Sequence, residues 1–145
     1  MAKKKASTKG IDTTASTNDN DTYTMLFDSM IISDAFQKLT PNGKLMLLYC
    51  RNQKTCKVGR ACLYELAKER AAMYNDNALI NKYMTEPYFV LPSKQLTRYG
   101  IDRRNATRYL KELEQQGFIE KVESNKGRYK TNLYKFVDTW KGNFK

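Results

Sequence analysis

The chain has 145 residues, of which 41% are hydrophobic, so one compact domain with an apolar core can form. Lys and Arg number 26 against 15 Asp and Glu, and the net charge of +11 favours a polyanionic partner, nucleic acid before an anionic membrane surface. The absence of His excludes a His general base, a His triad and His metal ligands, and no spacing of carboxylates, Lys or Tyr suggests another catalyst, so we expect neither enzymatic activity nor a cofactor.

The first 22 residues are rich in Lys, Ser, Thr, Asn and Asp, and Ile11 is their only large apolar residue. Such a segment buries too little surface to offset the entropy of ordering, so we expect a disordered tail over 1–22 and an ordered domain over 23–145. The lysines at 3–5 are either an arm that touches phosphates or a solvated terminus. Because this tail lacks an apolar signal region and no run approaches the ~20 apolar residues of a membrane span, we expect a cytoplasmic protein with no membrane partner.

Start signals mark two helices near residue 40. Ser33 is a candidate N-cap for a short helix that ends near Leu39. Thr40 followed by Pro41 is a stronger signal, because Thr caps helices and Pro suits the first helical position, and this helix should extend over 41–52. Its apolar residues with core spacing are Leu45, Leu48 and Tyr49.

The next segment carries weaker signals. Residues 53–60 (QKTCKVGR) are predicted to be a polar connector. Residues 60–74 favour a helix whose apolar stripe contains Leu63, Leu66 and Ala67, with Tyr74 as a further candidate. Residues 75–87 are ambiguous between a loop and one or two helical turns.

The remaining elements follow one another closely. Asp102 is a good N-cap and Gly117 a good residue just beyond the end of a helix, so a long amphipathic helix is predicted between them. Alternation of apolar and polar residues before and after a Gly-containing turn predicts a hairpin. The predicted order is a strand at 88–91, a short helix at 93–99, the long helix at 102–116, strands at 118–123 and 128–137, and a turn at 124–127.

This order is typical of a winged helix-turn-helix. The predicted fold class is therefore mainly α with a small antiparallel β-hairpin wing, organised as a winged helix-turn-helix with a helical insertion over about 53–87. That insertion is longer than the fold needs between its first helix and its bracing helix. It is either a surface for a partner or a homodimer, or a helical elaboration of the core.

The long helix has two different faces. Ala106, Tyr109, Leu110 and Leu113 can face the core, and four cations precede its first Glu on the other side. In a helix-turn-helix the second helix enters the major groove, where Arg can pair with guanine and Asn with adenine. The alternative is an ordinary solvated face, but such a face usually mixes both signs of charge. The predicted major-groove residues are Arg103, Arg104, Asn105, Thr107 and Arg108.

Further cations lie on the neighbouring elements, where they would contact phosphates. Residues 88–145 hold 13 of the 26 Lys and Arg but 6 of the 15 Asp and Glu, so most of the excess charge lies there. Basic residues in a hairpin also discourage pairing of strand edges, which is the alternative for those at the tip. The predicted phosphate contacts are Lys94, Lys111, Lys126, Arg128 and Lys130.

The cysteines and aromatic residues favour structural roles. Cys50, Cys56 and Cys62 are five residues apart, unlike the short spacing of zinc ligands, so reduced, buried or half-buried thiols are expected rather than a metal site. The ten Tyr and six Phe could stack on single-stranded bases, but most lie at core or hairpin positions. Trp140 is expected to dock the end of the chain onto the domain.

Three separated motifs resemble the winged-helix proteins carried on plasmids and integrative conjugative elements of Gram-positive bacteria. The resemblance implies a DNA-binding accessory protein in transfer, replication or transcription control of a mobile element. It covers roughly half of the chain. The matching residues are Leu39-Thr40-Pro41 with Leu48-Tyr49 at the opening, Leu113, Gly117, Phe118, Ile119 and Glu120 at the join into the wing, and Tyr134, Phe136, Asp138 and Trp140 at the end.

Three functions can be compared on these grounds. The first is a sequence-specific binder of double-stranded DNA, acting as a regulator or as an accessory factor at a transfer or replication origin. The second is a winged-helix interaction module that docks a relaxase, a replication initiator or another protein. The third is a metal-dependent nuclease or recombinase, which would need converging carboxylates, whereas the acidic residues here are scattered. The first agrees best with the charge pattern.

Overall fold

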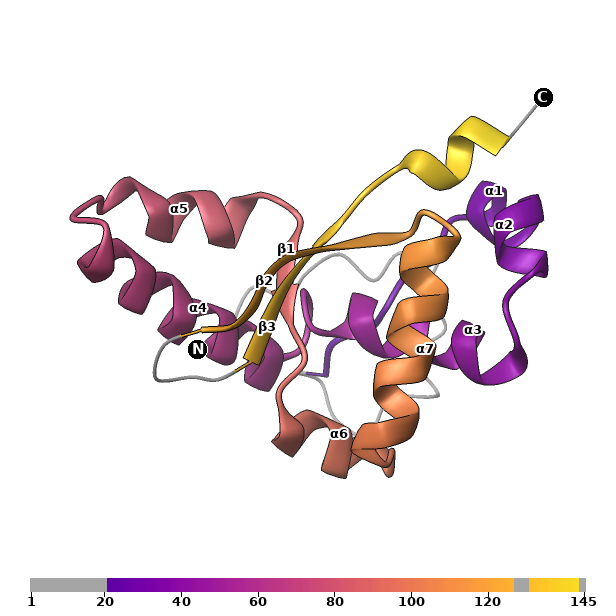
Figure 1. Cartoon of the computed structure of the whole chain (residues 1–145), viewed down its shortest axis with the longest axis horizontal. Coiled ribbons are helices and arrows are strands. Elements are labelled where there is room, and N and C mark those ends of the chain that lie inside the picture. The colour runs from indigo at the N-terminus through magenta and orange to yellow at the C-terminus, as the bar shows by residue number, and fades with distance from the viewer. Residues whose placement is uncertain (1–20, 127–130, 144–145) are drawn as a thin grey trace, which may run out of the picture.

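A computed structural model describes residues 21–126 and 131–143. Over these residues the chain is mainly helical, with a three-stranded antiparallel sheet (Figure 1). The predicted tail lies outside the described residues except for its last two positions. Residues 127–130, which include Arg128 and Lys130, also lie outside them.

Three helices open the domain, and the second and third begin where the capping residues predict, whereas the first was not predicted. They are α1 (Asp28–Ile31), α2 (Asp34–Gln37) and α3 (Pro41–Asn52). Ser33 Oγ accepts a hydrogen bond from the Phe36 amide at 3.1 Å, and Thr40 Oγ1 accepts one from the Gly43 amide at 3.1 Å. Both N-caps are therefore confirmed.

The predicted core stripe of α3 is wrong. Leu45 and Leu48 are 46% and 36% exposed, and Tyr49 is half-buried. The buried stripe lies one residue further along, at Met46, Leu47 and Cys50. Residues 45–50 are all apolar, so two overlapping stripes have helical spacing, and only packing against the rest of the domain selects between them.

Two helices fill the predicted insertion, α4 (Lys57–Met73) and α5 (Ala78–Thr85), and α5 packs along α4 (Figure 1). The prediction of a connector to residue 60 is wrong, because α4 begins at Lys57. Cys56 is its N-cap, and its Sγ accepts a hydrogen bond from the Gly59 amide at 3.3 Å. The predicted apolar stripe of α4 is confirmed at Leu63, Leu66 and Ala67, which are buried, but not at Tyr74, which is 54% exposed at the end of the helix.

The second half has the predicted order of elements, with one strand pairing that was not predicted. Strand β1 pairs antiparallel with β3, so the strands run in the order β1-β3-β2 and form a sheet rather than an isolated hairpin. The elements are β1 (Tyr88–Val90), α6 (Ser93–Tyr99), α7 (Arg103–Gln115), β2 (Ile119–Lys126), β3 (Thr131–Phe136) and a 3-10 turn, η2 (Thr139–Asn143).

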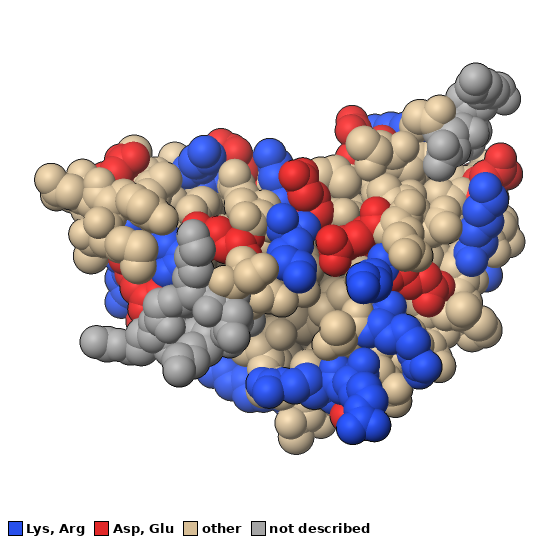
Figure 2. All heavy atoms as spheres, viewed as in Figure 1, with Lys and Arg blue, Asp and Glu red and all other residues tan. Residues whose placement is uncertain are grey.

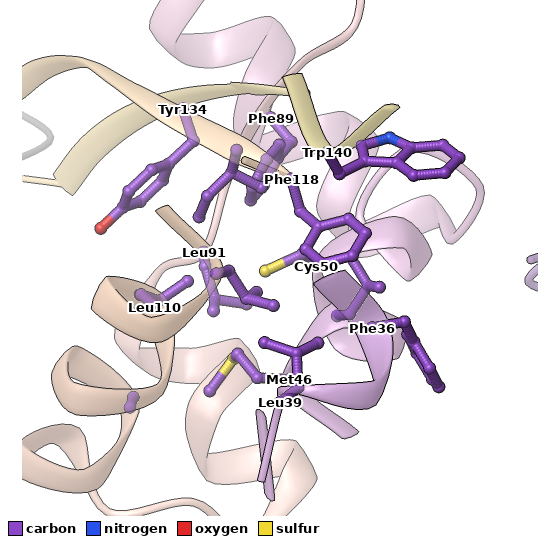
Figure 3. Packing of buried hydrophobic residues seen from close by; sticks show 14 of the residues in the cluster. Phe36, Leu39, Met46, Cys50, Phe89, Leu91, Leu110, Phe118, Tyr134 and Trp140 are labelled. Carbon is purple, nitrogen blue, oxygen red and sulfur yellow. The ribbon is translucent and has the colours of Figure 1, made fainter. Parts of the chain in front are cut away.

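The sheet separates two hydrophobic clusters, because alternate residues of a strand point to opposite faces. Phe89 and Tyr134 join the main cluster, where side chains from α3, α7 and the sheet meet (Figure 3). Tyr88, Val90 and Leu133 join a second cluster. That cluster also contains Leu63, Leu66, Ala67 and Tyr83 of α4 and α5. The insertion is therefore the cover of the second face of the sheet.

The end of the chain closes the corner between α7 and β2. Trp140 is 5% exposed and stacks on Phe118 with ring centroids 5.9 Å apart, as predicted for its docking role. Gly117 has a positive φ of 84°, and a Cβ there would lie 2.6 Å from Thr139 Oγ1. Only glycine satisfies both the backbone conformation and this close approach.

A buried ion pair joins the insertion to the hairpin. Arg70 of α4 is fully buried, and its Nε donates to Glu123 Oε1 of β2 at 2.7 Å. Its Nη1 donates to Glu69 Oε1 at 2.6 Å. Burial alone would lower the pKa of Arg70, but the hydrogen bonds and charges of the two carboxylates outweigh it and raise that pKa.

We predict that Glu123→Ala lowers the free energy of unfolding by about 2–3 kcal/mol, because a buried guanidinium loses one of its two carboxylates. Urea denaturation measures the change. The matched control is Glu65→Ala on α4, the helix of Arg70. The 3.0 Å pair of Glu65 with Lys68 is nearly half exposed and should contribute under about 1 kcal/mol. Equal effects of the two variants would show that the buried ion pair contributes no more to the free energy of unfolding than the exposed one.

Candidate nucleic-acid interface

A tight turn fixes the angle between α6 and α7. Gly100 ends α6 with a positive φ of 72°, and the Ile101 amide returns to the Leu96 carbonyl at 2.9 Å. Asp102 then starts α7, where its Oδ1 accepts a hydrogen bond from the Arg104 amide at 3.1 Å. The predicted cap is confirmed, and it sets the first turn of α7 beside the start of α6.

The inner face of α7 is as predicted. Ala106, Leu110 and Leu113 are buried in the main cluster, and Tyr109 is half-buried against it. Rotation of the helix about its own axis would expose these side chains. The outward direction of the opposite face is therefore fixed by the core.

The outer face of α7 is cationic. Within the described residues, none of its cations forms an ion pair with a carboxylate. Figure 2 shows Lys and Arg side chains gathered along the lower edge of the view, where α6 and the start of α7 lie. The exposed predicted residues are Arg103, Arg104, Thr107, Arg108 and Lys111, and Asn105 is half-buried at the boundary.

The three arginines have different surroundings. Arg103 Nη2 donates to Ser93 Oγ at 2.6 Å, which holds its guanidinium at the junction of α6 and α7. Arg108 Nη2 donates to Asn105 Oδ1 at 2.9 Å, so these two side chains form a pair. No hydrogen bond of the Arg104 guanidinium is found within the described residues. Arg104 is therefore the arginine with most freedom to meet a ligand.

Helix α6 adds cations beside this face. The predicted residue Lys94 is exposed in its first turn. Arg98, which the sequence analysis did not select, is exposed one turn later, and its Nη1 donates to Gln95 Oε1 at 2.6 Å. Arg98 follows Lys94 by one helical turn, so both lie on one side of the helix. This spacing could have identified Arg98 from the sequence.

A buried polar cluster anchors α6 to the end of α3. Gln95 is fully buried and donates from Nε2 to Gln53 Oε1 at 2.8 Å. The Tyr99 hydroxyl accepts hydrogen bonds from Asn52 Nδ2 at 2.6 Å and Gln53 Nε2 at 2.7 Å. The Tyr99 ring stacks on Tyr49 at 4.3 Å. These directional contacts hold the bracing helix in one position.

A second polar contact anchors α7 to the start of α3. Glu112 Oε2 accepts a hydrogen bond from Thr40 Oγ1 at 2.9 Å, and its other oxygen accepts one from the Thr40 amide. A carboxylate at a helix N-terminus is favourable for the helix dipole. Gly43 makes room for it, since a Cβ there would collide with the carboxylate. Glu112 therefore positions α7, a role that its place in the sequence did not reveal.

The hairpin part of the predicted interface is only partly described. Lys126 ends β2, and its side chain is outside the described residues, as are Arg128 and Lys130. The base of the hairpin is packed between α7 and the insertion. The three predicted contacts of the hairpin with phosphates therefore stay predictions.

The cysteines are free thiols. Cys50 is buried, and burial raises the pKa of its thiol, while Cys56 caps α4 and Cys62 is half-buried. Within the described residues, no group of three or more Cys, Asp or Glu side chains is arranged to hold a metal ion. In the same part of the chain, no helix has both the length and the apolar character needed to cross a membrane.

Comparison with known proteins gives no relative. No family model matches the chain, and no curated protein or solved structure shows significant similarity to it.

We predict that Glu112→Ala lowers the free energy of unfolding by about 1–2 kcal/mol, because α3 loses a cap and a favourable charge at its N-terminus. Thermal or urea denaturation measures the loss. Glu114→Ala on the same helix is the control and should cost less than about 0.5 kcal/mol.

A double-mutant cycle sharpens this test. Gly43→Ala alone should destabilise the protein, because its methyl group displaces the Glu112 carboxylate. In the Glu112→Ala background the same change should be neutral or stabilising, because Ala favours helix more than Gly does. Additive effects would contradict the assigned contact.

Proposed function

We propose that the chain is a winged helix-turn-helix protein that binds double-stranded DNA in a sequence-specific manner. The observation that carries the proposal is the cationic outer face of α7, whose arginines point away from the core and have no carboxylate partner within the described residues. The order β1, α6, turn, α7, β2, β3 supports it.

In this proposal α7 lies in the major groove. Arg104 is the base-reading residue, since its guanidinium can meet the two acceptors of guanine. Arg108 and Asn105 act together, and Thr107 lies in the same stripe. Arg103, held by Ser93, contacts the backbone or an outer base at the α6–α7 junction.

The flanking cations would contact phosphates. Lys94 and Lys111 are exposed on either side of the reading residues, and Lys126, Arg128 and Lys130 would do so from the wing. Such contacts orient the protein on the duplex and make its affinity depend on salt.

The biological setting is proposed from the resemblance described above. It is control of transcription, replication or conjugation of a plasmid or related mobile element. A relaxase or replication protein would then be a second partner, bound through surfaces away from α7.

We predict that Arg104→Ala weakens binding to a selected duplex about 10–100-fold, because a bidentate contact with a base is lost. Binding to a random duplex should fall much less. The target is first obtained by selection from a random DNA library, and fluorescence anisotropy then measures both affinities.

Two variants control for charge. Arg104→Lys keeps the charge but not the planar fork, so it should retain binding to random DNA and lose specific binding. Lys82→Ala removes an exposed cation from α5, far from α7, and should change neither. Equal losses on both duplexes with Arg104→Ala would move this residue to the phosphate-contacting class. Failure to select any sequence would contradict the proposed function.

Lys94→Ala and Lys111→Ala should each reduce the slope of log K against log salt by about 0.9, the release of one counterion, with similar losses on selected and random DNA. A salt titration of each variant measures the slope. An unchanged slope for both would show that neither lysine contacts a phosphate.

A further inference from the structure

A cavity of about 630 Å³ lies at the end of α3, away from the outer face of α7. It is partly open to solvent, and it is bordered by residues 21–25 ahead of α1 and by residues 85–87 between α5 and β1. Its size is within the range of small-molecule sites. The lining residues that matter here are Tyr23, Met25, Arg51, Lys54, Arg60 and Phe136.

Arg51 is the central cation of this cavity. It is half-buried, and its guanidinium carbon lies 4.9 Å from the centroid of the Phe136 ring. Burial lowers the pKa of Arg51. Among residues 21–126 and 131–143, no carboxylate forms an ion pair with it. A half-buried guanidinium without a carboxylate partner in this part of the chain is available for a charge-assisted contact with an anionic ligand.

Two further cations line the same space. Lys54 is also half-buried, and its Nζ donates to the backbone carbonyl of Glu86 at 2.9 Å. Burial and then the nearby charge of Arg60 lower the pKa of Lys54. Asp21 and Glu86 lie on the lining too, so the cavity has mixed charge, but the side that holds the three cations is positive.

Most of the remaining wall is apolar. It consists of Tyr23, Met25, Pro87 and Phe136, with threonines at 22, 55 and 85 between them. Apolar walls with a few convergent polar groups are the usual composition of a site for a small organic molecule. A bare inorganic ion would leave these walls in contact with water.

We propose that this cavity binds a small organic anion, with an aromatic or other apolar body against Phe136 and Met25 and a sulfonate, carboxylate or phosphate group on Arg51 and Lys54. Charge-assisted contacts with the guanidinium and ammonium groups would favour an anionic group at these two half-buried cations. The site is separate from the outer face of α7, so the inference goes beyond the proposed DNA binding and is tested on the free protein.

The experiment uses three probes in titrations followed by ¹H–¹⁵N NMR spectra of the full chain. 1-Naphthalenesulfonate has both required parts, 1-naphthalenemethanol lacks the charge, and sulfate lacks the apolar body. The sulfonate should shift resonances of residues 51–54, 23–25 and 136, and it should bind about tenfold more tightly than either other probe.

Variants of the cations then test which side chains bind the sulfonate group. Arg51→Met keeps an apolar side chain over Phe136 and should weaken the sulfonate about tenfold or more, while Arg51→Lys should retain part of the affinity. Lys54→Met is a second test if Arg51→Met does not fold. Lys82→Met on α5 is the matched control and should bind as the parent protein does.

Three outcomes would overturn the proposal. The first is the absence of any shift at about 5 mM sulfonate, a limit beyond which binding is too weak for a site. The second is equal affinity for the sulfonate and the neutral alcohol, which would leave no role for the cations. The third is a set of shifts located on α7 instead of around the cavity, because the anion would then bind the outer cationic face.

Discussion

The two-sided burial of a small sheet is the constraint on which this fold depends. Strands β1 and β3 alternate, so Phe89 and Tyr134 enter one cluster while Val90 and Leu133 enter the other. A one-residue shift in register would exchange the two sets and disturb both clusters together. The sheet therefore couples α3, α6 and α7 on one side to α4 and α5 on the other, and Arg70 with Glu123 adds a buried electrostatic link across the same boundary.

The position of α7 is determined by contacts of three kinds. Leu110 and Leu113 fix its rotation, Glu112 ties its C-terminal part to the start of α3, and the turn at Gly100 fixes its approach from α6. Helix α6 is itself held by Gln95 and the hydroxyl group of Tyr99. The cations of the outer face are thus carried by a helix whose position is already fixed. Little conformational entropy of the backbone is therefore lost when they bind a ligand.

Local signals were enough to predict much of this arrangement. Thr40 with Pro41, Asp102 and Gly117 placed the ends of α3 and α7 because capping depends on neighbouring residues alone. The core face of α3 could not be predicted, since Leu45 and Met46 belong to equally apolar stripes. The start of α4 was missed because Cys is an unusual cap, and the roles of Glu112 and Arg70 depend on partners 72 and 53 residues away. Arg51 and Arg60, which line the cavity, belong to helices whose own patterns gave no reason to select them.

The burial of β1 and β3 on both faces has a mechanical result. A hairpin with one bare face can tilt at its base. Here Leu133 of β3 packs against α4 and α5 on one side and α7 packs on the other, so the hairpin has no free direction. The spacing between the long helix and the start of the hairpin is consequently a rigid dimension of the protein. If a duplex binds to both elements, any mismatch in groove width has to be absorbed by bending of the nucleic acid, and flexible base steps would be preferred at positions that no side chain touches.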